Sequence, residues 1–350
     1  MKKVNQLNSR ERFFATIERK PVDRPAAWLG MPDIQSQPGL FECYGVKNLH
    51  ELKLAVGDDF YAVEVPYESP DSNAIYAAFN WYAESGVDVA HRTLTSDGCF
   101  KDAESLSDLD FFEWPDPEKY IDPAECRRRV EEAPEDKVRL GILWCAHFQD
   151  ACASFGMETA LMNMITNPEL YQAVDRKILD FYLKANEIFF EATRGKLDAV
   201  LIGNDMGSQR GLMLSPDMIR KFVMPGCREL IAQAHRYHLK VIYHSCGSIA
   251  DIIPDLIDAG ADVIHPIQAL AAGMEPATLK ARFGDRVAFC GGVDTQQLLV
   301  HGSEADVREK VRELKRIFPT GLIISPSHEA ILPDIPPRNI HALFDEAQSM

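Results

Sequence analysis

The sequence predicts a single (β/α)8 barrel, the TIM-barrel fold of the α/β class. From about residue 138 onward, short β-branched or apolar runs alternate with longer amphipathic stretches, which is typical of parallel strands joined by helices. Six such units follow one another, and two more strands can be assigned near the start, which makes the eight that close a barrel. A length of 350 residues agrees, because such barrels often exceed 200 residues as one domain.

Each predicted strand ends in polar or glycine-containing residues. The eight are Arg24–Gly30, Asp59–Pro66, Val138–Cys145, Ala199–Asp205, Lys240–Cys246, Asp262–Gln268, Val287–Val293 and Gly321–Ser325. Helical periodicity predicts helices at Ser9–Lys20, Asn167–Ala192, Ser215–Tyr237 and Ser303–Phe318. Residues 67–137 have few periodic apolar positions, so we interpret them as an insertion in the connection after the second strand, within one domain that spans residues 1–350.

The composition disfavours several classes of partner. Lys and Arg number 37 against 53 Asp and Glu, a net charge of -16 that repels nucleic acids and anionic membranes. Neither a signal peptide nor an apolar run of membrane-spanning length is evident, so we expect a cytoplasmic protein. The eight cysteines are scattered without any CxxC, which fits a reducing compartment where thiols can serve as ligands.

The most specific local motif is YHSCGS, at the end of the fifth predicted strand. In extended chain, residues i and i+2 point to the same side, so His244 and Cys246 converge on one point. Zinc is bound by this pairing of nitrogen and sulfur. The alternative is a chance pair of side chains packed inside the barrel, since an isolated HxC is a weak motif.

Further ligands must come from other strand ends, because a catalytic zinc takes three protein ligands and one open position. Our preferred third ligand is His328, after the last strand, and Cys290 on the seventh strand is the alternative. Asp205 or Asn204, after the fourth, would lie near the open position.

Other residues at the predicted mouth are weaker candidates for substrate binding. Gln209 and Arg210 could hold an anionic end of a substrate, or form an exposed loop with no ligand. Trp28 could line the opening, although aromatic residues at strand ends more often pack in the core or at the rim.

Taken together, the motifs resemble the uroporphyrinogen decarboxylase-like superfamily over nearly the whole chain. The resemblance rests on the segments RERFFATIERKPVDRPAAW, FGMETALMNMITNPEL, NDMGSQRGLMLSPDMIRKFVMPG, YHSCGSIADIIPDLIDAGADVIHPIQ, FCGGVDTQQLL and GLIISPSHEAILPDIPPRNI. It implies a single (β/α)8 barrel and places Asp294, in GGVDT, in the cleft as a catalytic candidate. The alternative role for Asp294 is an N-cap of the following helix.

Within this superfamily, true uroporphyrinogen decarboxylases are cofactor-free and carry an Arg-Gln-Ala-Gly-Arg segment near the first strand. The corresponding PAAWLGMPDIQ lacks both arginines. Since guanidinium groups are the usual partners of substrate carboxylates, decarboxylation of a tetrapyrrole becomes the second choice.

The zinc-dependent corrinoid methyltransferases of the methylcobamide:coenzyme M type carry His-x-Cys and a later Cys as zinc ligands. His244 and Cys246 match the first pair, and His328 stands where the later Cys is expected. The resemblance therefore implies zinc, a methylcorrinoid carried by a partner protein, and methyl transfer to or from a thiol or another small molecule. With His328 in place of a thiolate, Asp205 in the fourth position would restore neutrality. A third possibility is a non-catalytic barrel that binds a small molecule or a corrinoid partner; a homo-oligomer is compatible with all three.

Overall fold

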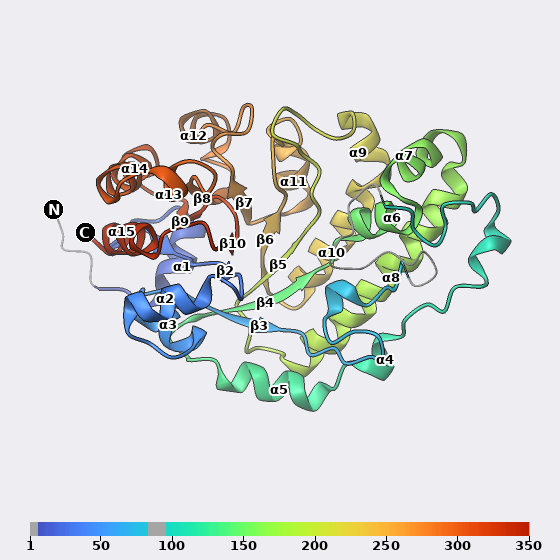
Figure 1. Cartoon of the computed structure of the whole chain (residues 1–350), viewed down its shortest axis with the longest axis horizontal. Coiled ribbons are helices and arrows are strands. Elements are labelled where there is room, and N and C mark those ends of the chain that lie inside the picture. Colours follow the sequence, from blue (N-terminus) through green and yellow to red (C-terminus); the bar gives the residue numbers. More distant parts are fainter. Residues whose placement is uncertain (1–5, 83–95, 350) are drawn as a thin grey trace.

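The structure, a computed structural model, describes residues 6–82 and 96–349. Its main element is a curled sheet of eight parallel strands in the order β1-β9-β8-β7-β6-β5-β4-β3, with helices packed around it (Figure 1). This is the predicted (β/α)8 architecture, and each predicted strand overlaps one observed strand. The strands are β1 (Ala26–Ala27), β3 (Phe60–Glu64), β4 (Val138–Trp144), β5 (Ala199–Gly203), β6 (Lys240–His244), β7 (Val263–Ile267), β8 (Ala288–Val293) and β9 (Leu322–Pro326).

Apolar side chains fill the inside of the barrel and its outer face. Leu140, Leu201 and Ile242 point inward and belong to the inner cluster, whereas Val200 and Val241 point outward into the larger core beneath the helices. Strands buried on both faces read as continuous apolar runs, which is why they could be recognised from the sequence.

The helices cover the outside of the sheet. They are α1 (Ser9–Ile17), α2 (Gln37–Tyr44), α3 (Leu49–Ala55), α4 (Pro117–Tyr120), α5 (Pro123–Glu132), α6 (His147–Phe155), α7 (Met157–Thr166), α8 (Pro168–Ala192), α9 (Pro216–Phe222), α10 (Met224–Arg236), α11 (Ile253–Ala259), α12 (Pro276–Phe283), α13 (Leu298–His301), α14 (Glu304–Ile317) and α15 (Pro337–Gln348). None of the helices described is long and apolar enough to cross a membrane.

One predicted helix is divided in two. The sequence predicts a continuous helix over Ser215–Tyr237, but α9 ends at Phe222 and α10 begins at Met224. Pro225 has no N–H to donate to the carbonyl four residues earlier, and its ring clashes with that carbonyl. The continuous-helix prediction is therefore wrong at this position.

The connection between β3 and β4 contains an aromatic cluster that the helical periodicity did not indicate. Phe79 stacks on Trp81 with ring centroids 4.6 Å apart, and Trp81 stacks on Phe112 at 5.0 Å. Phe79 also packs edge-on against Phe181 of α8 at 4.7 Å, so the connection is attached to the main core. Short 3-10 turns at Ile75–Ala77 and Leu106–Leu109 precede α4 and α5 in this connection.

A second, two-stranded sheet extends β1 and β9 beyond the barrel. In it β2 (Met31–Pro32) pairs in parallel with β10 (Ala330–Ile331). The two segments approach closely at Gly30, which has φ +81° and where an added Cβ would lie 2.3 Å from the carbonyl oxygen of Glu329. Only glycine suits such a backbone conformation and such a contact.

The edge between β1 and β3 is closed largely by one carboxylate. The backbone N–H of Asp59 donates to the carbonyl of Ala27 at 3.0 Å, and the N–H of Ala27 donates to Oδ2 of Asp59 at 2.8 Å. Arg12 and Arg24 also donate to this fully buried carboxylate, at 2.7 and 2.8 Å. A buried anion with two guanidinium partners thus takes the place of a regular ladder at the seam of the barrel.

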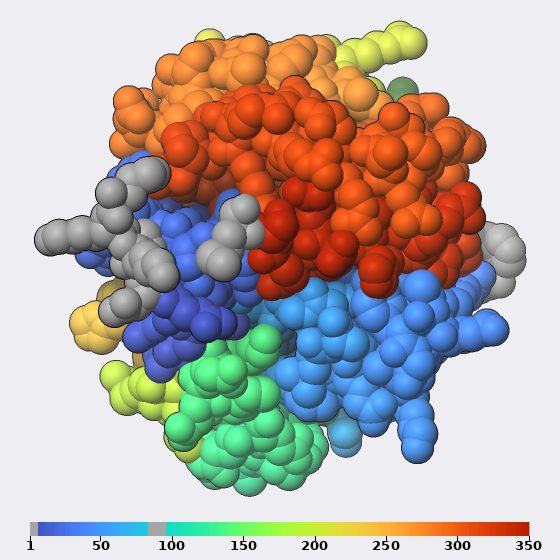
Figure 2. All heavy atoms as spheres, turned by 90° about the vertical axis from the view of Figure 1, so that its left-hand side faces the viewer, coloured from blue at the N-terminus to red at the C-terminus, as the bar shows by residue number. Residues whose placement is uncertain are grey.

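The C-terminal helices lie beside the N-terminal helices. Figure 2 shows the C-terminal helices, in red, packed beside the N-terminal helices, in blue. The side chain of Gln348, at the end of α15, donates to the carbonyl of Gly57 at 2.8 Å. The last helix therefore supports the segment that leads into Asp59.

Replacing Asp59 with alanine tests the role of this seam. We expect Asp59→Ala to lower the free energy of unfolding by about 3–5 kcal/mol, because the buried Arg12 is left without one of its carboxylates. Urea denaturation followed by circular dichroism measures the change. Asp285→Ala, at a fully exposed carboxylate, serves as the control and should match the wild type. A loss for Asp59→Ala below about 1 kcal/mol would contradict the role assigned to this residue.

Candidate metal centre and its cavity

Ligand-type side chains gather at the C-terminal ends of four strands. Asp205 follows β5, His244 ends β6 with Cys246 two residues later, His265 lies in β7, and Glu329 follows β9. Reacting groups in barrels of this type are found at this end, since loops there converge above the packed interior.

Asp205, His244 and Cys246 form the first group. Nε2 of His244 lies 3.2 Å from Oδ1 of Asp205 and 3.5 Å from the sulfur of Cys246. Oδ1 of Asp205 also accepts the backbone N–H of Cys246 at 2.8 Å, and Gln149 donates to its other oxygen at 3.2 Å. All three ligand atoms lie within 4.8 Å of one another, close enough to hold one metal ion.

His328 joins this group through the thiol. Its side chain is hydrogen-bonded to Cys246, which raises the pKa of His328 although partial burial opposes the shift. Nδ1 of His328 accepts the backbone N–H of Ala330 at 3.0 Å, and this leaves Nε2 as the ring nitrogen available to Cys246. The three predicted ligands and Asp205 are thus brought together.

A second group lies on the other side of the His244 ring. Nδ1 of His244 is 3.0 Å from Nδ1 of His265 and 3.5 Å from Oε2 of Glu329, and all three residues are buried. The sequence offers His265 and Glu329 as side chains at strand ends, but neither belongs to the preferred set of ligands.

The field around His244 favours positive charge. Burial alone would lower the pKa of His244, but Glu329, Asp205 and Cys246 raise it well above its ordinary value. Burial likewise opposes ionisation of Asp205, yet the hydrogen bond and charge of His244 lower the pKa of that carboxyl to about 2. The pKa of His265 is lowered well below its usual range, first by burial and then by the neighbouring histidines. This donor set is therefore suited to a cation.

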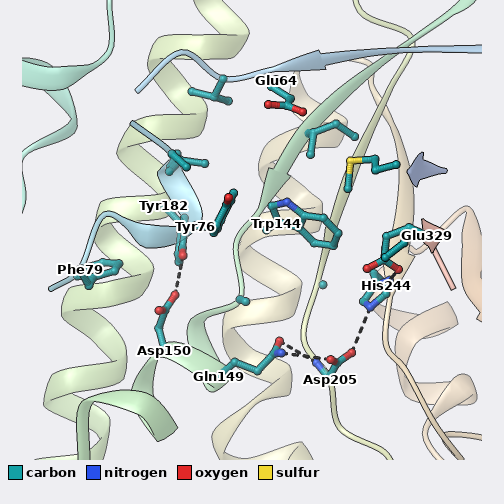
Figure 3. A pocket seen from close by; sticks show the side chains of 18 of the residues that line it. Glu64, Tyr76, Phe79, Trp144, Gln149, Asp150, Tyr182, Asp205, His244 and Glu329 are labelled. Carbon is teal, nitrogen blue, oxygen red and sulfur yellow. Dashed lines mark hydrogen bonds and ion pairs between the residues drawn. The ribbon is translucent and has the colours of Figure 1, made fainter. Parts of the chain in front are cut away.

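The group opens into a cavity of about 770 Å³. Figure 3 shows Asp205, His244 and Glu329 at one end and the rings of Tyr76, Phe79 and Tyr182 at the other. Asp150 accepts the Tyr182 hydroxyl at 2.6 Å and the Trp81 indole N–H at 3.1 Å. The cavity is in the size range of small-molecule sites and combines an aromatic wall with a polar end.

Trp144 lies between the two ends of this cavity. The pairing of β4 with β5 shifts register between Ile142 and Trp144, and Trp144 and Cys145 have φ of 62° and 57°. Such values are rare for residues other than glycine, and a bulge re-aims the side chain that follows it. The indole meets the His244 ring edge-on, with centroids 5.6 Å apart, and so covers the candidate centre.

The remaining predicted residues lie elsewhere. Trp28 is fully buried in the inner cluster, below His265, with ring centroids 5.0 Å apart. Gln209 and Arg210 are exposed and do not line the cavity. Asp294 accepts the backbone N–H groups of residues 296, 297 and 298 at the start of α13, as an N-cap does, and lines a different depression.

Cys290, the alternative third ligand, is buried within the barrel beside Ser325. Burial raises the pKa of its thiol, which opposes the thiolate form that binds metals. Among the residues described, it belongs to neither group of candidate metal ligands.

Asn204 belongs to a buried network behind the centre. Its carbonyl oxygen accepts the N–H of Phe148 at 2.8 Å, and its amide lies 3.4 Å from the Tyr243 hydroxyl. That hydroxyl is 2.9 Å from the sulfur of Cys227, which lies 3.9 Å from Nε2 of His147. The network thus holds the neighbours of Asp205 and His244.

The pairing of the buried His147 with Asp175 should make the stability of the fold depend on pH. Burial opposes its charge, but Asp175 at 2.7 Å raises the pKa of His147 to about 10. Because the folded pKa exceeds the unfolded value near 6.5, the contribution is complete below pH 6.5 and is lost as the pH rises toward 10.

We therefore expect the free energy of unfolding of the wild type to fall more steeply between pH 7 and 9 than that of His147→Gln, by up to about 1.4 kcal/mol per pH unit. Urea titrations at several pH values measure both slopes. His301→Gln, at an exposed histidine, should keep the wild-type slope. Equal slopes for His147→Gln and the wild type would contradict the assignment.

Comparison with known proteins gives a family and a fold. A family model for uroporphyrinogen decarboxylase (URO-D) matches residues 100–350. A methyltransferase from Methanosarcina mazei has a similar structure, with a TM-score of 0.69 and 17% identity over 97% of this chain and 98% of that chain. At this identity the likeness shows a shared fold.

A second structural likeness is much weaker. A Listeria monocytogenes protein assigned to vitamin-B12-independent methionine synthase has a TM-score of 0.42 and 12% identity, over 93% of this chain and 96% of its own. No curated protein matches the sequence.

Proposed function

The chain belongs to the uroporphyrinogen decarboxylase (URO-D) family, and within it we propose a zinc-dependent methyltransferase that moves a methyl group between a corrinoid on a partner protein and a thiol or another small molecule. The observation that carries the proposal is the group of Asp205, His244 and Cys246 at one end of a cavity, with His328 bonded to the thiol. The methyltransferase of similar fold supports the choice within the family.

The residues fit zinc in donor type and in charge. Imidazole nitrogen, thiolate sulfur and carboxylate oxygen are the three ligand classes of protein zinc sites. Neutral His244 and His328, with a Cys246 thiolate and an Asp205 carboxylate, sum to two negative charges and would neutralise Zn²⁺. The raised pKa of His244 supports this assignment, because it reflects a surrounding field that favours positive charge.

Bound zinc would supply the Lewis acidity that turns a thiol into a thiolate at neutral pH. The methylcorrinoid of the partner protein would supply an electrophilic methyl group, which would pass to the sulfur of the acceptor while the electron pair of the cobalt–carbon bond stays with the corrinoid. The thiol proton leaves to solvent. Asp205 is the one carboxylate in the set and lines the cavity, where its negative charge would help to neutralise the ion before an acceptor arrives.

The chain's own residues would orient the acceptor. Hydrogen bonds from the Cys246 backbone and Gln149 fix both oxygens of Asp205. The Trp144 ring covers His244 and excludes water from that side of the centre. The aromatic wall of Tyr76, Phe79 and Tyr182 then leaves room for the body of a small molecule.

Tetrapyrrole decarboxylation receives less support. Among the described residues that line the cavity, Arg129 is the one arginine or lysine, and its Nε donates to Glu125 at 2.9 Å. Carboxylates in the lining outnumber it; they are Asp33, Glu64, Asp150, Asp205 and Glu329. A substrate with many carboxylates would be repelled by such a lining.

Metal analysis is the first test of the proposal. We expect about one zinc per chain in the purified wild type and none in the double variant His244→Ala, Cys246→Ala, because two of its ligands are gone. Cys43→Ser, at an exposed thiol, is the control and should retain zinc. Cys290→Ala should also retain it; zinc loss there would reassign the third ligand, and full occupancy of the double variant would contradict the centre.

The second test measures methyl transfer. We expect the wild type to convert methylcobalamin and a small thiol, coenzyme M among those tried, into the methyl thioether and cob(I)alamin, detected by absorbance and mass spectrometry. Cys246→Ala should lower the rate by at least about 100-fold, since the centre no longer holds its metal. Consumption of uroporphyrinogen by the wild type, without methyl transfer, would favour the decarboxylase instead.

A further inference from the structure

Both ring nitrogens of His244 have polar neighbours, and the residues beside Nε2 differ from those beside Nδ1. Nε2 faces Asp205, which lines the cavity, and Cys246. Nδ1 faces His265, which is 0% exposed, and Glu329, which is 8% exposed although it borders the cavity. An imidazole that binds a metal through one nitrogen carries its proton on the other, so the buried side determines which nitrogen is free.

We propose that His265 and Glu329 are positioning residues that hold the Nδ1–H of His244 and thereby present Nε2 to the metal. This inference rests on the proposed function only for the identity of the ion. Metal-bound histidines generally donate their second ring proton to a neighbouring acceptor, which fixes tautomer and ring orientation.

The hydrogen-bond distances support this role. At 3.0 Å, one proton lies between the two Nδ1 atoms, and His265 can accept it only when its own proton is on Nε2. Within residues 6–82 and 96–349, Nε2 of His265 has no hydrogen-bond partner, and the His265 ring meets the Trp28 ring edge-on, with centroids 5.0 Å apart. Oε2 of Glu329, 3.5 Å from Nδ1 of His244, is likewise buried without a hydrogen-bond donor and supplies the negative charge that favours the proton there.

The backbone keeps Glu329 in this position. The N–H of Met31 donates to the Glu329 carbonyl at 2.7 Å, and Ala330 pairs with Met31 in the small parallel sheet. The absence of a side chain at Gly30 permits this contact. The β2–β10 sheet therefore fixes the residue that stands behind His244, which gives this sheet a role at the centre.

A second metal ion between His244, His265 and Glu329 is the competing interpretation, because their ligand atoms also lie within 4.8 Å of one another. Two ions would require both nitrogens of His244 to lose their protons and form an imidazolate. One ion needs only the neutral ring, so we expect a single zinc.

Zinc affinity, measured on metal-free protein by competition with a fluorescent chelator, tests the proposal without reference to activity. The matched pair is His265→Leu, which removes the acceptor, and His265→Asn, whose side-chain oxygen can replace Nδ1. We expect roughly 10–100-fold weaker zinc binding for His265→Leu and Glu329→Leu. His265→Asn and Glu329→Gln, which keep an acceptor, should recover part of that loss.

Glu275→Gln, at an exposed carboxylate, should bind zinc as the wild type does. Thermal denaturation of the metal-free variants checks that they fold, and the visible spectrum of the cobalt(II)-loaded variants reports altered geometry at the metal, which a purely structural role would leave unchanged.

Three results would overturn the proposal: wild-type affinity in both leucine variants, complete loss of zinc in Glu329→Gln as in the ligand double variant, or two zinc ions in the wild type and one in His265→Leu. Absence of zinc from the wild type would instead refute the proposed function, and this outcome is distinguishable from the other three.

Discussion

The structure depends on the seam between the barrel strands β1 and β3, where one buried carboxylate takes the place of the backbone hydrogen bonds that join the other strands. Asp59 joins β1 to β3 and is neutralised by Arg12 and Arg24. Charges inside a protein are tolerated only when they are paired and fully hydrogen-bonded. This seam lies at the N-terminal end of β3, opposite the candidate centre. The barrel thus separates the residues that close it from those of the candidate metal centre.

At the opposite end of the barrel, the acidic groups of the candidate centre are not fully paired with positive charges. Asp205, Glu329 and the Cys246 thiol surround His244, and the result is a region that attracts a positive charge. The raised pKa of His244 reflects that demand, and a bound dication would meet it more completely. The Trp144 ring beside His244 provides weakly polar surroundings in which such electrostatic effects are strong.

The sequence predicted those features that depend on local periodicity. Continuous apolar runs located all eight strands, and two-residue spacing brought His244 and Cys246 to one side. Strand-end reasoning also brought Asp205 and His328 to this group, but it could not tell which other strand-end side chains would contact the His244 ring. His265 and Glu329 contact His244 only because strands β6, β7 and β9 curl into a barrel. Trp144 is turned inward by a bulge, which no pattern in the sequence predicts. Asp294 is a predicted site residue that lies outside the candidate centre. A carboxylate at a strand end can equally cap a helix, and the oxygens of Asp294 accept three backbone N–H groups.

The contact of Gly30 with Glu329 has a consequence for the order in which the molecule is completed. About 300 residues separate the two, so a growing polypeptide cannot make the contact until residue 329 has been synthesised. Until β9 has been made, β1 has no strand to pair with on that side and remains an open edge, a state prone to wrong pairing. The candidate centre can therefore form only after these residues, and a chain released before residue 322 would lack β9, His328 and Glu329.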